Sequence, residues 1–177
     1  MEYTHYWNQT RNFTDLEWAQ ITTAAMRIIK SAVVKGIKLV NQNGEYGTDP
    51  IVSCNEIALN GVKEDSYDTF YLARTLKGNR WSVKKQVWEH GESFCKTNGK
   101  PYDSVVVSIL AAAKGLAPTA IKVTSDGGDE AIKMQFPEKL SVIKIIDDQF
   151  QPVSKTVEYN VTEWDFSVIY KNKGSRK

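Results

Sequence analysis

The sequence predicts an α+β fold, with two helices on one face of a mainly antiparallel sheet. Two segments, 13–36 and 101–115, carry helical patterns, while shorter β-branched and aromatic segments lie before, between and after them. This order, β-α-β-β-β-α-β with further strands behind it, is that of a split β-α-β plan. A chain of 177 residues, 41% of them hydrophobic, can bury one core. We therefore expect a single domain over residues 1–170 and a disordered basic tail over 171–177.

The first helix is expected between Phe13 and Gly36. Thr14 with Glu17 makes a capping box at its start, and Phe13 is placed to pack on Trp18 as a hydrophobic staple. Gly36 ends the apolar periodicity, as a glycine does after a helix C-terminus. The apolar residues that recur at helical spacing, and that we expect to face the core, are Trp18, Ile21, Ala25, Ile28 and Ala32.

The second apolar segment, 101–115, can be read as a strand or as a helix. Its three consecutive valines favour a strand. Its length, its three consecutive alanines, Pro101 near the first turn and Gly115 at the end favour a helix. We predict the helix.

The β segments are placed by side-chain alternation and by turn residues. Gly78-Asn79 is predicted to close an inserted hairpin between 70–76 and 81–88. A second hairpin near the end of the chain forms a C-terminal β extension. With these additions, the plan resembles the ferredoxin-like fold. The other expected strands are 2–8, 37–40, 52–61, 67–74, 119–128 (which ends in a turn), 140–147 paired with 155–161, and 164–170.

Charge is distributed unevenly along the chain. The overall net charge is +2, and it becomes −2 for the body once the +4 of the tail is set aside, which excludes a generally basic surface. The exception is the stretch 69–88, which has five cations and no acid. Basic residues interleaved with tryptophans suit phosphate contacts and base stacking, but a solvated hairpin that covers a sheet edge is the better explanation. The residues concerned are Arg74, Lys77, Arg80, Trp81, Lys84 and Lys85.

Catalytic and metal-binding motifs are not found in the sequence. The two histidines, His5 and His90, do not lie at metal-ligand spacing from a cysteine, and no C-x-x-C or glycine-rich phosphate loop occurs. Cys95 paired with a histidine, or a pair of carboxylates, is the weakest alternative; a buried, unreactive Cys95 is the better interpretation. We therefore expect no enzymatic activity, no cofactor and no metal. The acidic clusters, which we interpret as turns, are Asp126, Asp129 and Glu130, and Asp147 with Asp148.

The stretch "FCKTNGKPYD", residues 94–103, precedes the second helix and predicts a binding site. The positive end of a helix favours an anion. Because the strands of a β-α-β crossover run parallel, the turn "TSDGG" should lie at the same sheet edge as this helix start. The alternative is that Asp103 or Asp126 pairs with a nearby lysine under Tyr102. The candidate ligand-binding residues are Lys96, Thr97, Lys100, Tyr102, Asp103, Ser125, Asp126 and Gly127.

A resemblance rests on four stretches of the chain. "EIALNG", "DTF", "FCKTNGKPYDSVV" and "VTSDGG" are similar to a family of small uncharacterised proteins of bacteriophages and prophages, from about Tyr3 to Gly128. The strongest element is F-C-K-T-x-x-K-P-Y-D. No activity is established for that family, so the resemblance implies a phage context and no chemistry.

In this context we expect a non-enzymatic accessory protein in the host cytoplasm, which blocks or sequesters a host or defence protein or a signalling nucleotide. A nucleic-acid-binding module using 74–88 is the second reading. The chain shows no apolar run long enough to span a bilayer, so we expect no membrane association. The apolar, β-branched segment 140–147 is expected to pair within the domain or to form the seam of a homodimer.

Overall fold

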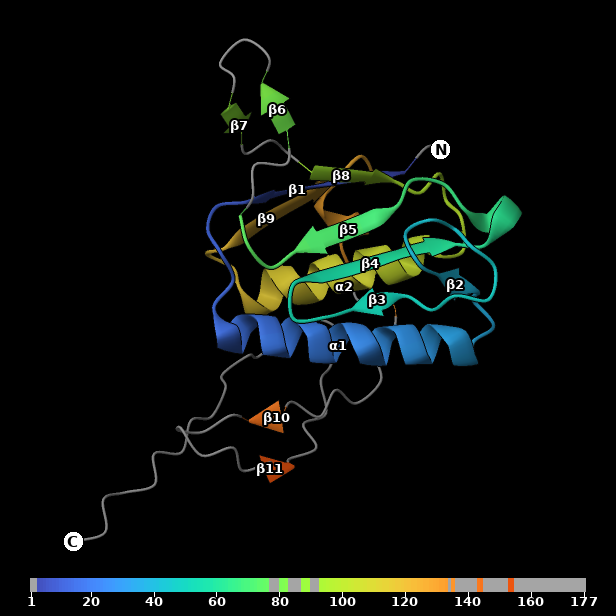
Figure 1. The fold of residues 1–177 in the computed structure, drawn as a ribbon, viewed down its shortest axis with the longest axis horizontal. Coiled ribbons are helices and arrows are strands. Elements are labelled where there is room, and N and C mark those ends of the chain that lie inside the picture. Colours follow the sequence, from blue (N-terminus) through green and yellow to red (C-terminus); the bar gives the residue numbers. More distant parts are fainter. Residues whose placement is uncertain are drawn as a thin grey trace, which may run out of the picture.

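The computed structural model describes residues 3–76, 80–82, 87–89, 93–133, 135, 143–144 and 153–154. Its helices and strands give a mixed α+β fold with mainly antiparallel sheets, as predicted (Figure 1). In the described part of the chain, no helix is long and apolar enough to cross a membrane. The elements are β1 (Thr4–Gln9), α1 (Asp15–Val34), β2 (Leu39–Val40), β3 (Ile51–Val52), β4 (Glu56–Gly61), η1 (Lys63–Asp65), β5 (Phe70–Ala73), β6 (Arg80–Ser82), β7 (Val87–Glu89), β8 (Ser93–Lys96), α2 (Asp103–Leu116), β9 (Ile121–Ser125), η2 (Asp129–Ala131), β10 (Ile143–Lys144) and β11 (Val153–Ser154).

The strand β1 lies in the centre of a three-stranded sheet. It pairs antiparallel with β8 on one side and with β9 on the other. The strands β8 and β9 therefore run parallel to each other, and α2 connects them, as the split β-α-β plan predicts. A second sheet has β4 at its centre, with β2 and β3 on one path and β5 also paired to β4. Among the described residues these two sheets are not joined by strand pairing into one ferredoxin-like sheet.

Local sequence signals place α1 as predicted. The Thr14 side chain accepts a hydrogen bond from the Glu17 backbone N–H, and the Glu17 carboxylate accepts one from the Thr14 N–H. Phe13 stacks on Trp18 at 5.7 Å between ring centroids. Hydrogen bonds from Arg11 lower the pKa of Glu17 to about 2. The helix ends before Gly36, whose φ of 87° is accessible to glycine without strain.

The core lies between the two helices and the strands that face them. The helices α1 and α2 pack against each other, and α2 packs on β9. Every residue of α2 from Val105 to Ala113 is buried, so the second helix is confirmed and is apolar around much of its circumference. The predicted stripe of α1 is confirmed as core. The fully buried strand residues that meet the helices include Ile57, Leu59, Phe70, Leu72 and Cys95.

Two strand predictions are corrected by the pairing. The predicted strand 52–61 is broken by a turn, because the Ser53 hydroxyl accepts hydrogen bonds from the backbone N–H groups of Asn55 and Glu56; β3 and β4 then pair antiparallel across it. The predicted pairing of 70–76 with 81–88 is wrong, because β5 pairs with β4 instead. The strands β6 and β7 pair antiparallel with each other, with Trp81 opposite Trp88.

The C-terminal β extension is described only in part. The strands β10 and β11 pair antiparallel, so 140–147 does contribute to a hairpin. Its partner is Val153–Ser154, which precedes the predicted 155–161. The predicted strands 155–161 and 164–170 and the tail 171–177 lie outside the described residues.

Candidate functional site

The predicted sheet edge is assembled around the start of β1. Thr4 lies opposite Lys96 of β8, and His5 lies between Cys95 and Ser125 of the two flanking strands. The backbone N–H of Asp126 donates to Thr4 O at 3.1 Å. The ends of β8 and β9 therefore do lie at one edge, as the parallel crossover predicts, and β1 separates them.

At this edge Asp103 holds a buried polar network rather than an open anion site. Its Oδ1 accepts a hydrogen bond from His5 Nε2 at 2.7 Å and another from the Thr97 hydroxyl. His5 is 1% exposed and Thr97 is fully buried. The predicted pairing of Asp103 with a lysine is not present, because the carboxylate meets a histidine 98 residues away in the sequence.

The two lysines of the predicted site point to another part of the chain. Lys100 Nζ donates to the backbone carbonyl of Glu64. Lys96 Nζ lies 5.7 Å from the ring centroid of Tyr67, a cation-π distance. Both cations therefore contact the connection between β4 and β5, on the β8 side of β1.

Tyr102 and the first turn of α2 are committed to internal hydrogen bonds. The buried Tyr102 hydroxyl donates to Asp68 O at 2.7 Å, and burial raises the pKa of this phenol. The backbone N–H of Asp103 donates to Lys100 O, and those of Val105 and Val106 donate to Tyr102 O. The N–H groups that would have received an anion are thus largely occupied.

The predicted residues at the end of β9 lie on the other side of β1 from the two lysines. The Ser125 hydroxyl accepts from the Gly127 N–H at 3.3 Å, and Asp126 and Gly127 are exposed. A cavity of about 410 Å³ lies beside the helix start, and its lining includes Lys100, Asp103 and the ion pair between Glu130 and Lys133. The lining of this cavity carries both positive and negative side chains. The Nδ1 atom of His5, which has no hydrogen-bond partner, is buried. Of the eight predicted residues only Lys100 and Asp103 line this cavity, so the eight do not converge on one ligand position.

Cys95 is confirmed as a buried thiol. Its side chain is fully buried and its sulfur lies 3.4 Å from Asp68 O. Burial, reinforced by the nearby Asp68 charge, raises the pKa of Cys95 to about 12. A thiolate nucleophile is strongly disfavoured there at neutral pH.

This difference predicts the labelling pattern of the native protein. A thiol reagent should modify the exposed Cys54 rapidly, and Cys95 only when the chain unfolds. Mass spectrometry of the labelled full chain would locate the adduct. The Cys54→Ser variant, which leaves Cys95 untouched, should show no rapid labelling; a fast adduct on Cys95 in that variant would contradict the burial argument.

The basic segment is mostly outside the part of the chain that the structure describes. The Arg74 guanidinium forms an ion pair with Asp15 at the start of α1, so this cation is engaged within the fold. The side chains of Lys77, Arg80, Trp81, Lys84 and Lys85 lie outside the described residues, as does His90. The nucleic-acid reading of this segment stays a prediction.

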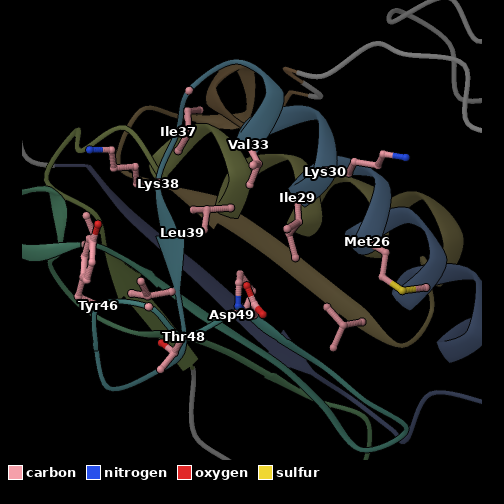
Figure 2. Close-up of a pocket in the computed structure, with 16 residues that line it drawn as sticks. Met26, Ile29, Lys30, Val33, Ile37, Lys38, Leu39, Tyr46, Thr48 and Asp49 are labelled. Atoms are coloured by element: carbon pink, nitrogen blue, oxygen red, sulfur yellow. The ribbon is translucent and has the colours of Figure 1, made fainter.

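A surface that the sequence interpretation missed lies along the second half of α1. Here the helix, β2 and the connection from β2 to β3 enclose an open groove of about 890 Å³ (Figure 2). The apolar side chains that line it come from all three elements; they include Met26, Ile29, Val33, Ile37, Leu39 and Tyr46. We call this the α1 groove.

Several of these apolar side chains are exposed to solvent. Tyr46 is 77% exposed, Val33 54% and Met26 52%, while Ile29 and Ile37 pack against the core from its edge. Met26 and Val33 lie outside the predicted core stripe of α1. Apolar residues on that additional face of the helix were the signal in the sequence that could have indicated the groove.

Within the described residues, no group of three His, Cys, Asp or Glu side chains is placed to hold a metal ion. Comparisons with models of protein families, with curated proteins and with solved structures return no match for this chain.

Proposed function

We propose that this chain is a non-enzymatic binding protein, and that it docks an apolar segment of a partner protein into the α1 groove. In the phage context that the sequence resemblance implies, the partner is a host or defence protein, which the bound chain blocks or sequesters. The observation that carries the proposal is the cluster of exposed apolar side chains around an open groove.

The energetic argument concerns water. Contiguous apolar surface exposed on a folded domain generally marks an interaction site, since its hydration is unfavourable. An occupant that covers Met26, Val33 and Tyr46 removes from water the side chains that the fold leaves half or more exposed. These side chains come from a helix and from a neighbouring connection, so a chain segment laid between them contacts both.

The residues of the other candidate sites are less available for binding or catalysis, which favours the α1 groove. Asp103, Thr97 and Tyr102 are committed to hydrogen bonds within the fold. The Cys95 thiol has its pKa raised to about 12, which disfavours nucleophilic catalysis by this group. A partner could bind in the α1 groove without breaking any of these hydrogen bonds.

The test is a selection of short random peptides displayed on a surface, with the full chain as target. Val33→Asp and Val34→Asp form a matched pair, because both valines are exposed but only Val33 lines the groove. Peptides that bind through the groove should lose about tenfold or more in affinity on Val33→Asp and little on Val34→Asp.

Tyr46→Ala is a second groove variant that spares the helix, and it should weaken the same peptides. Circular dichroism and thermal unfolding would verify that each variant is folded. If no enriched peptide distinguishes Val33→Asp and Tyr46→Ala from Val34→Asp, the groove is not a docking site and the proposal is wrong.

A further inference from the structure

The α1 groove contains one carboxylate among its apolar side chains. Asp49 lines the groove, and Figure 2 places it in the middle, between the α1 side chains such as Ile29 and the side chains of Tyr46 and Thr48. Asp49 is exposed, and within the described part of the chain no hydrogen bond or ion pair joins its side chain to another group. An exposed carboxylate such as this one is hydrated by solvent water.

Covering the groove would remove that water. A carboxylate taken into an apolar, low-dielectric contact is costly unless a cation or several N–H donors replace its hydration. Burying Met26 and Val33 under an entirely apolar segment would therefore be favourable, but removing water from Asp49 would be unfavourable. A segment that brings a guanidinium or ammonium group to the same point avoids this loss and forms a charge-assisted hydrogen bond.

The two lysines that line the groove do not require an acidic partner. Lys30 and Lys38 are exposed, and Figure 2 shows their amines directed away from the groove, on its two sides. Long lysine side chains can keep their charged ends in water while their methylenes line an interface. Solvent and salt screen such exposed charges, so their repulsion of a basic partner is small.

We propose that the partner segment is apolar with a basic residue, lysine or arginine, that pairs with Asp49. The inference rests on the proposed function, since it names the chemistry of the segment that occupies the groove. Asp49 then sets the position and direction of the segment, while the apolar side chains supply most of the contact area.

The sequences enriched in the peptide selection test this directly. Among peptides that depend on Val33, a basic residue flanked by apolar ones should recur at one position. Fluorescence anisotropy with one such peptide should show at least about a tenfold loss of affinity on Asp49→Asn. Asp126→Asn, which removes an exposed carboxylate outside the groove, is the matched control and should change nothing.

A charge exchange separates pairing from a general effect on the surface. On the Asp49→Lys protein, the same peptide should bind poorly, and its variant with glutamate in place of the basic residue should recover affinity. Val33-dependent peptides without a basic preference, with an acidic preference, or insensitive to Asp49→Asn would overturn this inference while leaving the groove as a docking site. If no Val33-dependent peptide is found, both proposals fail together.

Discussion

Replacing Asp103 with alanine is expected to destabilise the protein by about 2–3 kcal/mol, because the buried His5 Nε2 loses its acceptor and the Thr97 hydroxyl keeps only its longer contact, 3.3 Å, to Tyr3 O. His5 Nε2 and the Thr97 hydroxyl both donate to Asp103 Oδ1, and neither residue is accessible to water. An unsatisfied buried donor costs more than the net value of the bond it had formed. Urea unfolding at neutral pH, followed by tryptophan fluorescence, would measure the loss.

Two further variants separate this network from other effects of the substitution. Asp103→Asn keeps an oxygen that can accept both hydrogen bonds and should lose less than half of what alanine loses. Asp126→Ala removes an exposed carboxylate from the same sheet edge and should be nearly neutral. If Asp103→Ala costs no more than Asp126→Ala, the network does not stabilise the fold as argued.

Gly61→Ala is expected to have an effect of similar size, about 3 kcal/mol, for a steric reason. A Cβ at Gly61 would lie 2.0 Å from the carbonyl oxygen of Asp65 and 3.1 Å from Tyr102 Cδ1. The η1 turn would have to move away from β4, and Tyr102 is fully buried behind it. Thermal and urea unfolding of the full chain would show the loss.

Gly44→Ala is a useful comparison for this substitution. Gly44 has a φ of 70° and open space around its Cα, so alanine there meets backbone strain alone, about 1–2 kcal/mol. Gly61→Ala should therefore be clearly the more destabilising of the two. Equal losses would mean that the η1 turn yields easily, and the packing argument would be wrong.

The features that the sequence predicted well are those in which interacting residues are near one another in the chain. Thr14 and Glu17 are three residues apart, and Phe13 and Trp18 are five apart. Backbone geometry alone brings such pairs together once a helix forms, so composition and spacing were sufficient. The α+β class and the parallel relation of β8 and β9 followed from the same helix assignments.

Strand pairing was harder to predict from the sequence, because a turn motif does not determine which strands pair. Gly78-Asn79 is a good hairpin signal, yet β5 pairs with β4 and the inserted hairpin pairs Trp81 with Trp88. The choice between these partners depends on how much apolar surface each pairing buries, which is a property of the whole sheet.

The sequence by itself determined the two helices, the caps of α1 and the edge at which β8 and β9 end, whereas Gly115, expected at the end of the second helix, lies inside α2. Only the tertiary structure decided what these residues contact. Asp103 accepts a hydrogen bond from His5, 98 residues away in the sequence, and Lys100 donates to the Glu64 carbonyl oxygen. The α1 groove likewise exists because α1, β2 and the connection carrying Tyr46 and Asp49 are brought together in space. Contacts between distant segments follow from the packing of complete elements, and local periodicity carries no information about that packing.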